Sequence, residues 1–279
     1  MPAQSPARRS RFILPDILSE VTFDLIPLRL HFIAPREIHF PIGTAANLLR
    51  GTLGASFMKT STDAYARRFT PGFAGGPSGL RDAPRAFVFR AWHLDGVTIA
   101  AGEPFDFGIN LFETKDGAVD LFAGAFSVPF GTPLKIEGAE LLRLPLEGTA
   151  QADRVRVQFV TPTELKGSDR PEFGTLFARI RDRVSTLRAL YGDGPLGIDF
   201  KAVGERAGQI QMTRCEIENI DIERTSRATG QRHSLGGFTG VAEYSGGLSE
   251  FLPYLEIARF TGVGRQTVWG KGEIEYETF

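Results

Sequence analysis

Hydrophobic and polar positions alternate over residues 21–32, where Arg29 and His31 fall on one face and leucines on the other. This period of two is typical of a half-buried strand. Beyond Thr44 the apolar positions recur every three or four residues, which predicts a capped helix through Phe57. Alternation returns at 86–92 and 105–112, a short helical stretch follows near 117–126, and a strand is predicted at 134–144.

The second half of the chain has the same predicted order of elements. A strand at 154–160 precedes a helix from Phe173 to Tyr191, whose apolar residues keep helical spacing. Two strands at 211–225 and 235–245, a helix at 248–258 and a terminal strand after residue 272 follow. Each half reads β-α-β-β-α-β, which predicts an α+β fold of tandem ferredoxin-like (RRM-like) domains at 16–147 and 148–279. Residues 1–15 are predicted to be a disordered lead-in.

Composition narrows the classes of function. The 32 Lys and Arg residues nearly balance 33 Asp and Glu, so any basic site must be local. The single cysteine, Cys215, excludes an internal disulfide, and no two histidines have the spacing of a metal pair. We therefore expect no cofactor and no metal. No apolar run reaches the ~18 residues of a membrane-spanning helix, so we expect a cytoplasmic protein without a membrane partner.

Glycine and basic residues gather near the C-terminal end, in TGVGRQTVWGKG. The spacing fits no nucleotide loop, because five residues separate Gly264 from Gly270 and Gly272 stands where a P-loop requires Ser or Thr. Glycines of this kind either shape a tight turn or let backbone amides approach a phosphate. The motif alone leaves both readings open, but it disfavours a nucleotide-dependent enzyme.

Five segments in a fixed order carry a family resemblance: RGTLGASF, YARRFTP, VTPTELKG, FARIRDRVSTLRALYGDGPL and the terminal GVGRQTVWGKGEIEY. Together they resemble the Cas6-type, CRISPR-associated repeat-processing endoribonucleases of the RAMP superfamily, over roughly residues 20–279. The resemblance implies two ferredoxin-like domains and a glycine-rich loop that contacts the RNA backbone between them. It also implies metal-independent cleavage of CRISPR repeat RNA in the precursor transcript, which yields mature guide RNA.

RNA carries its own nucleophile, the 2′-hydroxyl, so such a site needs only alignment, a proton acceptor and a cation at the phosphate. The family commonly places a catalytic histidine in or just after the first helix, helped by Tyr and Lys. Residues 47–69 hold Lys59, Tyr65 and Arg68 but no histidine. His39 is the histidine closest to this region in sequence, and with Lys59 and Tyr65 it forms the predicted catalytic set. The identity of the base stays open, since a histidine-poor site that relies on cations is the alternative.

The predicted RNA-binding residues combine the basic cluster between two C-terminal strands with the glycine-rich loop. They are Arg68, Arg224, Arg227, Arg232, His233, Gly262, Gly264, Arg265, Gln266, Gly270 and Lys271. A solvated turn is the alternative for the cluster. The alternative for the whole chain is a non-catalytic RAMP RNA-binding subunit of a CRISPR effector complex. CRISPR repeat RNA is the expected partner, other effector subunits are candidates, and a monomer or homodimer is expected.

Overall fold

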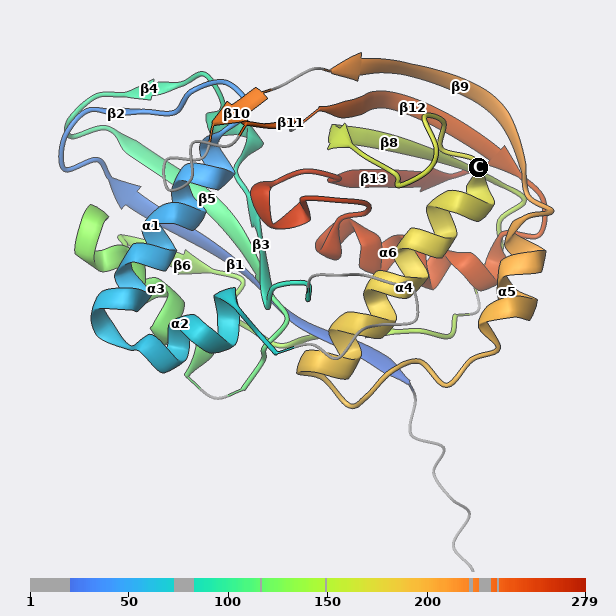
Figure 1. Ribbon diagram of the computed structural model, residues 1–279, viewed down its shortest axis with the longest axis horizontal. Helices are drawn as coiled ribbons and strands as arrows, with labels where there is room; N and C mark the ends of the chain where they lie inside the picture. The colour runs from blue at the N-terminus through green and yellow to red at the C-terminus, as the bar shows by residue number, and fades with distance from the viewer. Residues whose placement is uncertain are drawn as a thin grey trace, which may run out of the picture.

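The computed structural model describes residues 21–72, 83–115, 117–148, 150–220, 223–225, 232–234 and 236–279. Two halves follow each other along the chain (Figure 1). The N-terminal half contains β1 (Thr22–Ile33), β2 (Ile38–His39), α1 (Ala45–Thr60), α2 (Thr62–Phe69), β3 (Phe87–Arg90), the 3-10 turn η1 (Trp92–Leu94), β4 (Thr98–Ile99), β5 (Pro104–Leu111), α3 (Ala118–Phe130), β6 (Lys135–Glu137) and β7 (Leu142–Pro145).

The C-terminal half contains β8 (Arg154–Thr163), α4 (Phe173–Tyr191), α5 (Phe200–Ala207), β9 (Gln211–Ile220), β10 (Glu223–Thr225), β11 (Arg232–Ser234), β12 (Gly237–Ser245), η2 (Ser249–Phe251), α6 (Leu252–Thr261), η3 (Thr267–Trp269) and β13 (Ile274–Thr278). Among the helices of the described ranges, none is long and apolar enough to cross a membrane.

An antiparallel sheet forms the centre of each half. The strand order is β3-β5-β1-β6 in the N-terminal half, where β7 also pairs with the start of β1, and β13-β8-β12-β9 in the C-terminal half. The four strands on each of these paths, counted in chain order, are arranged alike: the first and third (β1 and β5, β8 and β12) lie in the middle, and the second and fourth lie at the sides. The predicted α+β class is confirmed.

Local patterns explain most elements. The helix predicted from Phe173 to Tyr191 is α4 with the same bounds, because its apolar face is long and regular. The eight-residue helices α2 and α5 went unpredicted, although Ser61 and Asp199 accept amide hydrogens at their starts. Thr44 precedes α1 at the predicted N-cap position, but its hydroxyl donates to the Pro41 carbonyl and makes no capping hydrogen bond to the helix.

Two hydrophobic cores lie on the helix sides of the sheets, and β1 belongs to both. Its first residues, Phe23 and Leu25, pack in the C-terminal core, whereas Leu30 and Phe32 pack in the N-terminal core. Val88, Phe112 and Leu146 of the N-terminal half also pack in the C-terminal core. Apolar contacts therefore cross the boundary that we predicted between residues 147 and 148, and the two halves share buried surface.

Side chains of the N-terminal half satisfy the carbonyls at the end of α6. Arg90 Nη2 donates to the carbonyls of Arg259 and Phe260 at 2.6 and 3.1 Å, and Asn110 Nδ2 donates to the Phe260 carbonyl at 2.8 Å. Arg183 of α4 donates from Nε to the next carbonyl, that of Thr261, at 2.9 Å. Because the last carbonyls of a helix have no partners within it, these donors join the two halves at a point where backbone polarity must be met.

Burial makes this junction costly as well as specific. Desolvation lowers the pKa of Arg90, which the nearby Glu273 carboxylate opposes, and it lowers the pKa of Arg183 to about 9. Burial also raises the pKa of Glu273, whose Oε2 lies 3.8 Å from Arg90 Nη1. A buried charge left without its partner is strongly destabilising. Removal of Arg90 would leave Glu273 without its partner and the Arg259 carbonyl without this donor, whereas Phe260 would keep the hydrogen bond from Asn110.

We predict that Arg90→Met lowers the free energy of unfolding by about 2–4 kcal/mol, because it removes two of the hydrogen bonds to the end of α6 and leaves Glu273 buried without its ion-pair partner. Urea denaturation at pH 7 measures this change. Arg29→Met is the matched control, since Arg29 is half exposed and pairs with Asp106 at the surface, and it should shift stability by about 0.5 kcal/mol or less. Equal effects of the two substitutions would contradict the proposed junction.

Candidate nucleic-acid interface

The loop between α6 and β13, residues 262–272, has an unusual backbone. Five of its residues have positive φ angles between 63° and 82°: Gly262, Gly264, Gln266, Gly270 and Gly272. Such angles disfavour residues that carry a Cβ, so the glycines are required by the path of the chain itself. Gln266 adopts this conformation in spite of its side chain.

The close approach that these glycines permit is to protein. A Cβ on Gly264 would collide with the carbonyl oxygen of Glu164, and a Cβ on Gly270 would lie 2.7 Å from the Cβ of Ala46 in α1. The amide of Arg265 donates to the Glu164 carbonyl at 3.0 Å, and the amide of Gly272 donates to the Pro162 carbonyl at 3.1 Å. We expected glycines that bring free amides to RNA phosphates, whereas these contacts fix the loop against β8 and α1.

The loop reaches out of the C-terminal half onto the N-terminal half, as Figure 1 shows for the red segment before β13. Its turn η3 contacts both α1 and β3. Val268 packs against the N-terminal core, and the guanidinium of Arg50 lies 5.9 Å from the ring of Trp269. Residues that follow Trp269 are therefore held at the start of α1.

Lys271 is buried at this position, with 4% of its surface exposed. Desolvation lowers its pKa, and the carboxylate of Asp95 acts in the opposite direction. Within the described ranges, no residue forms a hydrogen bond or an ion pair with its ammonium. A buried ammonium that lacks a direct partner is costly, so Lys271 is the predicted RNA-binding residue whose environment most favours an incoming anion.

Asp95 connects Lys271 to α1. Its Oδ1 accepts the amide hydrogen of Ala45 at 2.8 Å and so caps the first turn of the helix. Burial raises the pKa of Asp95, and the Ala45 amide and Lys271 oppose that rise. Because Asp95 stands 50 residues from the helix that it caps, no local sequence signal could have indicated this role.

His39 lies in the strand pair beside Asp95. It faces Thr98 in the β2–β4 ladder, and its Nδ1 lies 2.9 Å from the Thr98 hydroxyl oxygen. The ladder continues through Phe40, whose carbonyl accepts the amide of Gly96, the residue after Asp95. His39 is exposed. The structure thus gathers His39, Asp95, Lys271 and the start of α1 at one end of the N-terminal half.

The other two predicted catalytic residues do not join this group. Lys59 lies near the end of α1, about 21 Å along the axis from Ala45 at 1.5 Å per residue. Tyr65 follows in α2, where its ring stacks on Phe69 with centroids 4.9 Å apart. Proximity to the first helix in sequence therefore misled the prediction of a His39, Lys59 and Tyr65 set, because a helix carries residues away from its start.

Two predicted RNA-binding arginines have carboxylate partners. Arg68 is buried, and its Nη2 lies 2.9 Å from Glu113 Oε2. That ion pair connects α2 to the end of β5, and desolvation lowers the pKa of Arg68. Arg265 is more accessible, with 61% of its side chain exposed, and it donates to Glu164 at 2.6 Å. Arg265 is therefore the better placed of the two to meet a ligand.

The predicted basic cluster lies in the hairpin of β10 and β11. The backbone pairs Arg224 with His233 and Thr225 with Arg232. Arg227 and the side chains of Arg224, Arg232 and His233 lie outside the described residues. In Figure 1 the hairpin stands beyond the ends of β9 and β12, toward the N-terminal half. Among the residues that the structure describes, no group of three or more His, Cys, Asp or Glu could hold a metal ion.

Comparison with known proteins identifies the relatives of this arrangement. Residues 157–274 match the family model described as CRISPR-associated endoribonuclease Cas6. A product complex of Cas6 from Thermus thermophilus matches with a TM-score of 0.60 at 15% identity, covering 91% of this chain and all of that chain. A product complex of another Cas6 matches with a TM-score of 0.56 at 16% identity, covering 91% of this chain and all of that one.

A Cas6-containing chain of a partial Cas6-RT-Cas1–Cas2 complex also matches, with a TM-score of 0.57 at 12% identity. That match covers 94% of this chain and 47% of the other. No curated protein sequence matches the chain. The sequence match over 157–274 and the fold match over nine-tenths of the chain agree with the resemblance that the motifs indicated.

We predict that Gly264→Ala lowers stability more than Gly167→Ala. Both glycines have φ angles near +82°, but a Cβ on Gly167 has nothing within 4 Å, whereas one on Gly264 meets the Glu164 carbonyl. Gly167→Ala therefore measures the backbone cost alone, about 1–2 kcal/mol. Thermal unfolding of both variants tests the difference, and equal losses would show that the loop relaxes around the added methyl group.

Proposed function

We propose that this protein, Cas6-type in its sequence over residues 157–274 and in its fold, cleaves CRISPR repeat RNA within the precursor transcript to release guide RNA. The RNA 2′-hydroxyl is the nucleophile, and no metal takes part. The observation that carries this proposal is the buried Lys271 side chain, which the terminal loop holds beside the start of α1, at the same end of the N-terminal half as solvent-exposed His39. A phosphate at this point would pair directly with the Lys271 ammonium, which Asp95 compensates only without a direct contact.

His39 is our candidate for the base. In the tautomer that carries its hydrogen on Nδ1, the ring donates to the Thr98 hydroxyl, and Nε2 is left as the proton acceptor. Nε2 then takes the proton of the 2′-hydroxyl while the 2′-oxygen attacks phosphorus. A 2′,3′-cyclic phosphate forms as the bond to the 5′-oxygen of the next nucleotide breaks, and that oxygen takes a proton from water and leaves as the 5′-hydroxyl of the downstream fragment. Lys271 stabilises the charge on the non-bridging oxygens.

Arg265, the β10–β11 hairpin and the loop backbone remain our proposed contacts to the rest of the repeat. Lys59, Tyr65 and Arg68 are supported less, since Lys59 lies near the far end of α1, Tyr65 stacks on Phe69 and Arg68 pairs with Glu113. The absence of a histidine from residues 47–69 supports a second candidate function, a non-catalytic RNA-binding subunit of a CRISPR effector complex. In that case the protein would bind RNA at the same site but would have no catalytic base.

We further propose that the two halves are tandem ferredoxin-like domains, 16–147 and 148–279. The β-α-β-β-α-β order and the central positions of the first and third strands support this assignment in each half. A cytoplasmic location and a monomeric or homodimeric state remain predictions from the sequence. One structural relative is a chain of a Cas6-RT-Cas1–Cas2 complex, so other CRISPR proteins are candidate partners here.

We expect the protein to cut the repeat RNA of its own locus in EDTA, leaving a 2′,3′-cyclic phosphate or a 3′-phosphate on the upstream fragment. Gel electrophoresis and mass spectrometry of the fragments check both points. A repeat with a 2′-deoxy sugar at the scissile nucleotide should bind and stay intact, because it lacks the nucleophile. Binding without any cutting of the all-RNA repeat would favour the non-catalytic alternative, and cutting of the 2′-deoxy repeat would refute the internal nucleophile.

Lys271→Met should weaken repeat binding while preserving or raising the melting temperature. Burial lowers the pKa of Lys271, so the folded protein holds this proton less strongly than the unfolded chain, and the charge costs stability at pH 7. Methionine fills similar space without that cost. Filter binding and thermal unfolding measure the two effects.

His39→Ala is the companion variant, and it should slow cutting by about 10²–10⁴-fold with little change in repeat affinity. Full activity of this variant would remove His39 from the mechanism.

A further inference from the structure

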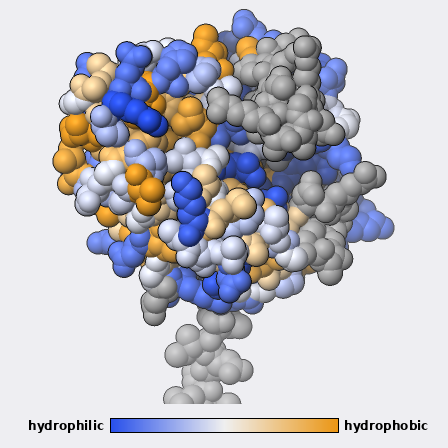
Figure 2. Space-filling view, turned by 60° about the vertical axis from the view of Figure 1, so that its left-hand side comes forward, coloured by the Kyte–Doolittle hydropathy of each residue, from blue (hydrophilic) through white to orange (hydrophobic). Residues whose placement is uncertain are grey.

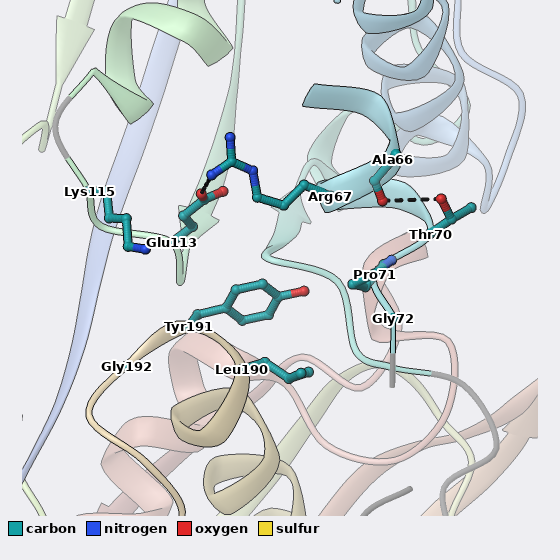
Figure 3. A pocket seen from close by; sticks show the side chains of 10 residues that line it. All are labelled: Ala66, Arg67, Thr70, Pro71, Gly72, Glu113, Lys115, Leu190, Tyr191 and Gly192. Atoms are coloured by element: carbon teal, nitrogen blue, oxygen red, sulfur yellow. Dashed lines mark hydrogen bonds and ion pairs between the residues drawn. The ribbon is translucent and has the colours of Figure 1, made fainter. Parts of the chain in front are cut away.

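A cavity of about 480 Å³ opens between the two halves, beside the end of α2 (Figure 3). Its walls come from the end of α2, the segment just after β5 and the end of α4. The residues that line it are Ala66, Arg67, Thr70, Pro71, Gly72, Glu113, Lys115, Leu190, Tyr191 and Gly192. Both halves therefore contribute to a space that the proposed cutting chemistry does not use.

Positive charge exceeds negative charge around this cavity. Arg67 has 60% of its side chain exposed and lies 3.4 Å from Glu113 Oε1, while the buried Arg68 holds the other oxygen of Glu113 at 2.9 Å. One carboxylate thus faces two guanidinium groups. Lys115 is exposed at the rim, and its ammonium has no ion-pair partner among the described residues. The cavity consequently attracts an anion, with Lys115 and Arg67 as its accessible cations.

Tyr191 provides an aromatic surface in the same space. Figure 3 shows its ring lying across the middle of the cavity, with Lys115 and Arg67 on one side and Pro71 near its hydroxyl end. The hydroxyl donates to the carbonyl of Pro84 at 2.9 Å, which fixes the direction of the ring. Burial raises the Tyr191 pKa to about 12, so the phenol stays neutral and keeps this bond at physiological pH.

An aromatic face beside two accessible cations is the combination that recognises a nucleotide, through stacking of the base and charge pairing of the phosphate. We infer that this cavity binds a single nucleoside phosphate, with its base on the Tyr191 ring and its phosphate at Lys115 and Arg67. This inference rests on the proposed function for its preferred source, a single-stranded part of the RNA substrate away from the cut. A free nucleotide has the same chemistry and is the other source.

Geometry separates this site from the proposed cutting site. Arg67 belongs to α2, whose Phe69 packs back on Gly54 of α1. Arg50 stands between the two sites, because its guanidinium lies 5.3 Å from the Phe69 ring and 5.9 Å from the ring of Trp269, two residues before Lys271. A strand that occupies both sites would therefore pass Arg50 on the seam. The cavity would hold a nucleotide that is not cut, and its occupation would strengthen binding without supplying a catalytic group.

The test measures binding of a fluorescein-labelled single-stranded hexauridylate to the full chain by anisotropy, across a salt series. Lys115→Glu should weaken binding about tenfold and flatten the salt dependence, because one phosphate contact is lost. Lys201→Glu is the matched control, since Lys201 is an exposed lysine of α5 with 88% of its side chain accessible, and it should change affinity less than twofold. Equal effects of the two reversals would overturn the site.

Two substitutions at Tyr191 test the aromatic contact. Tyr191→Leu should weaken hexauridylate binding about tenfold, the scale of a lost base stack, whereas Tyr191→Phe should retain most of it. Because Tyr191 also packs against both cores, melting temperatures are measured alongside, and affinity is taken from the folded fraction. A loss in Tyr191→Leu that only follows its unfolded fraction would contradict stacking.

Competition and cleavage assays distinguish the source of the nucleotide and the two proposals. Uridine monophosphate competes with the labelled hexamer for the cavity. If it displaces the hexamer at a concentration similar to that of unlabelled hexamer, the ligand of the cavity is a free nucleotide and not an RNA strand. Displacement only by longer RNA supports the strand. One result is that the wild-type protein fails to cut its repeat while Lys115→Glu still weakens hexauridylate binding more than Lys201→Glu does. That result would support the nucleotide site in the cavity and refute the proposed cleavage. The converse result overturns the cavity alone.

Discussion

The carbonyls at the end of α6 govern the arrangement of this protein. They must find donors, and Arg90 and Asn110 of one half and Arg183 of the other provide them. The terminal loop begins at the next residue, Gly262, so the junction also fixes where that loop leaves the C-terminal half. The position of Lys271 follows from a backbone requirement satisfied several residues earlier.

From Gly262 the loop crosses to the N-terminal half, so residues of both halves form the site. Contacts of Gly270 with Ala46 and of η3 with α1 hold it on the N-terminal half, and Lys271 is buried there near Asp95. Asp95 both caps α1 and lessens the cost of the buried ammonium. Lys271 belongs to the C-terminal half, whereas Asp95 and His39 belong to the N-terminal half. The site therefore exists only while the two halves are in contact.

Local periodicity allowed the fold class and the long elements to be predicted, because β1 and α4 each show a repeating apolar face over ten or more residues. Short helices such as α2 escaped, since eight residues carry too few apolar positions. The site was harder to predict, since Asp95 acts on a helix 50 residues away and Lys59 is carried from His39 by that helix. Sequence also could not indicate whether a glycine such as Gly264 approaches RNA or protein backbone.

The sheet of the C-terminal half also bears on where RNA can bind. RRM domains present aromatic side chains on the open face of the sheet. Here Arg156 pairs across neighbouring strands with Glu243 at 2.8 Å and with Glu277 at 2.6 Å, and Arg214 pairs with Glu216 of its own strand at 2.8 Å. Arg156 lowers the pKa of Glu243 and keeps it ionised. Because its charges already compensate one another and its glutamates repel phosphate, this face of the C-terminal sheet offers RNA less than the seam, where cations lack full compensation.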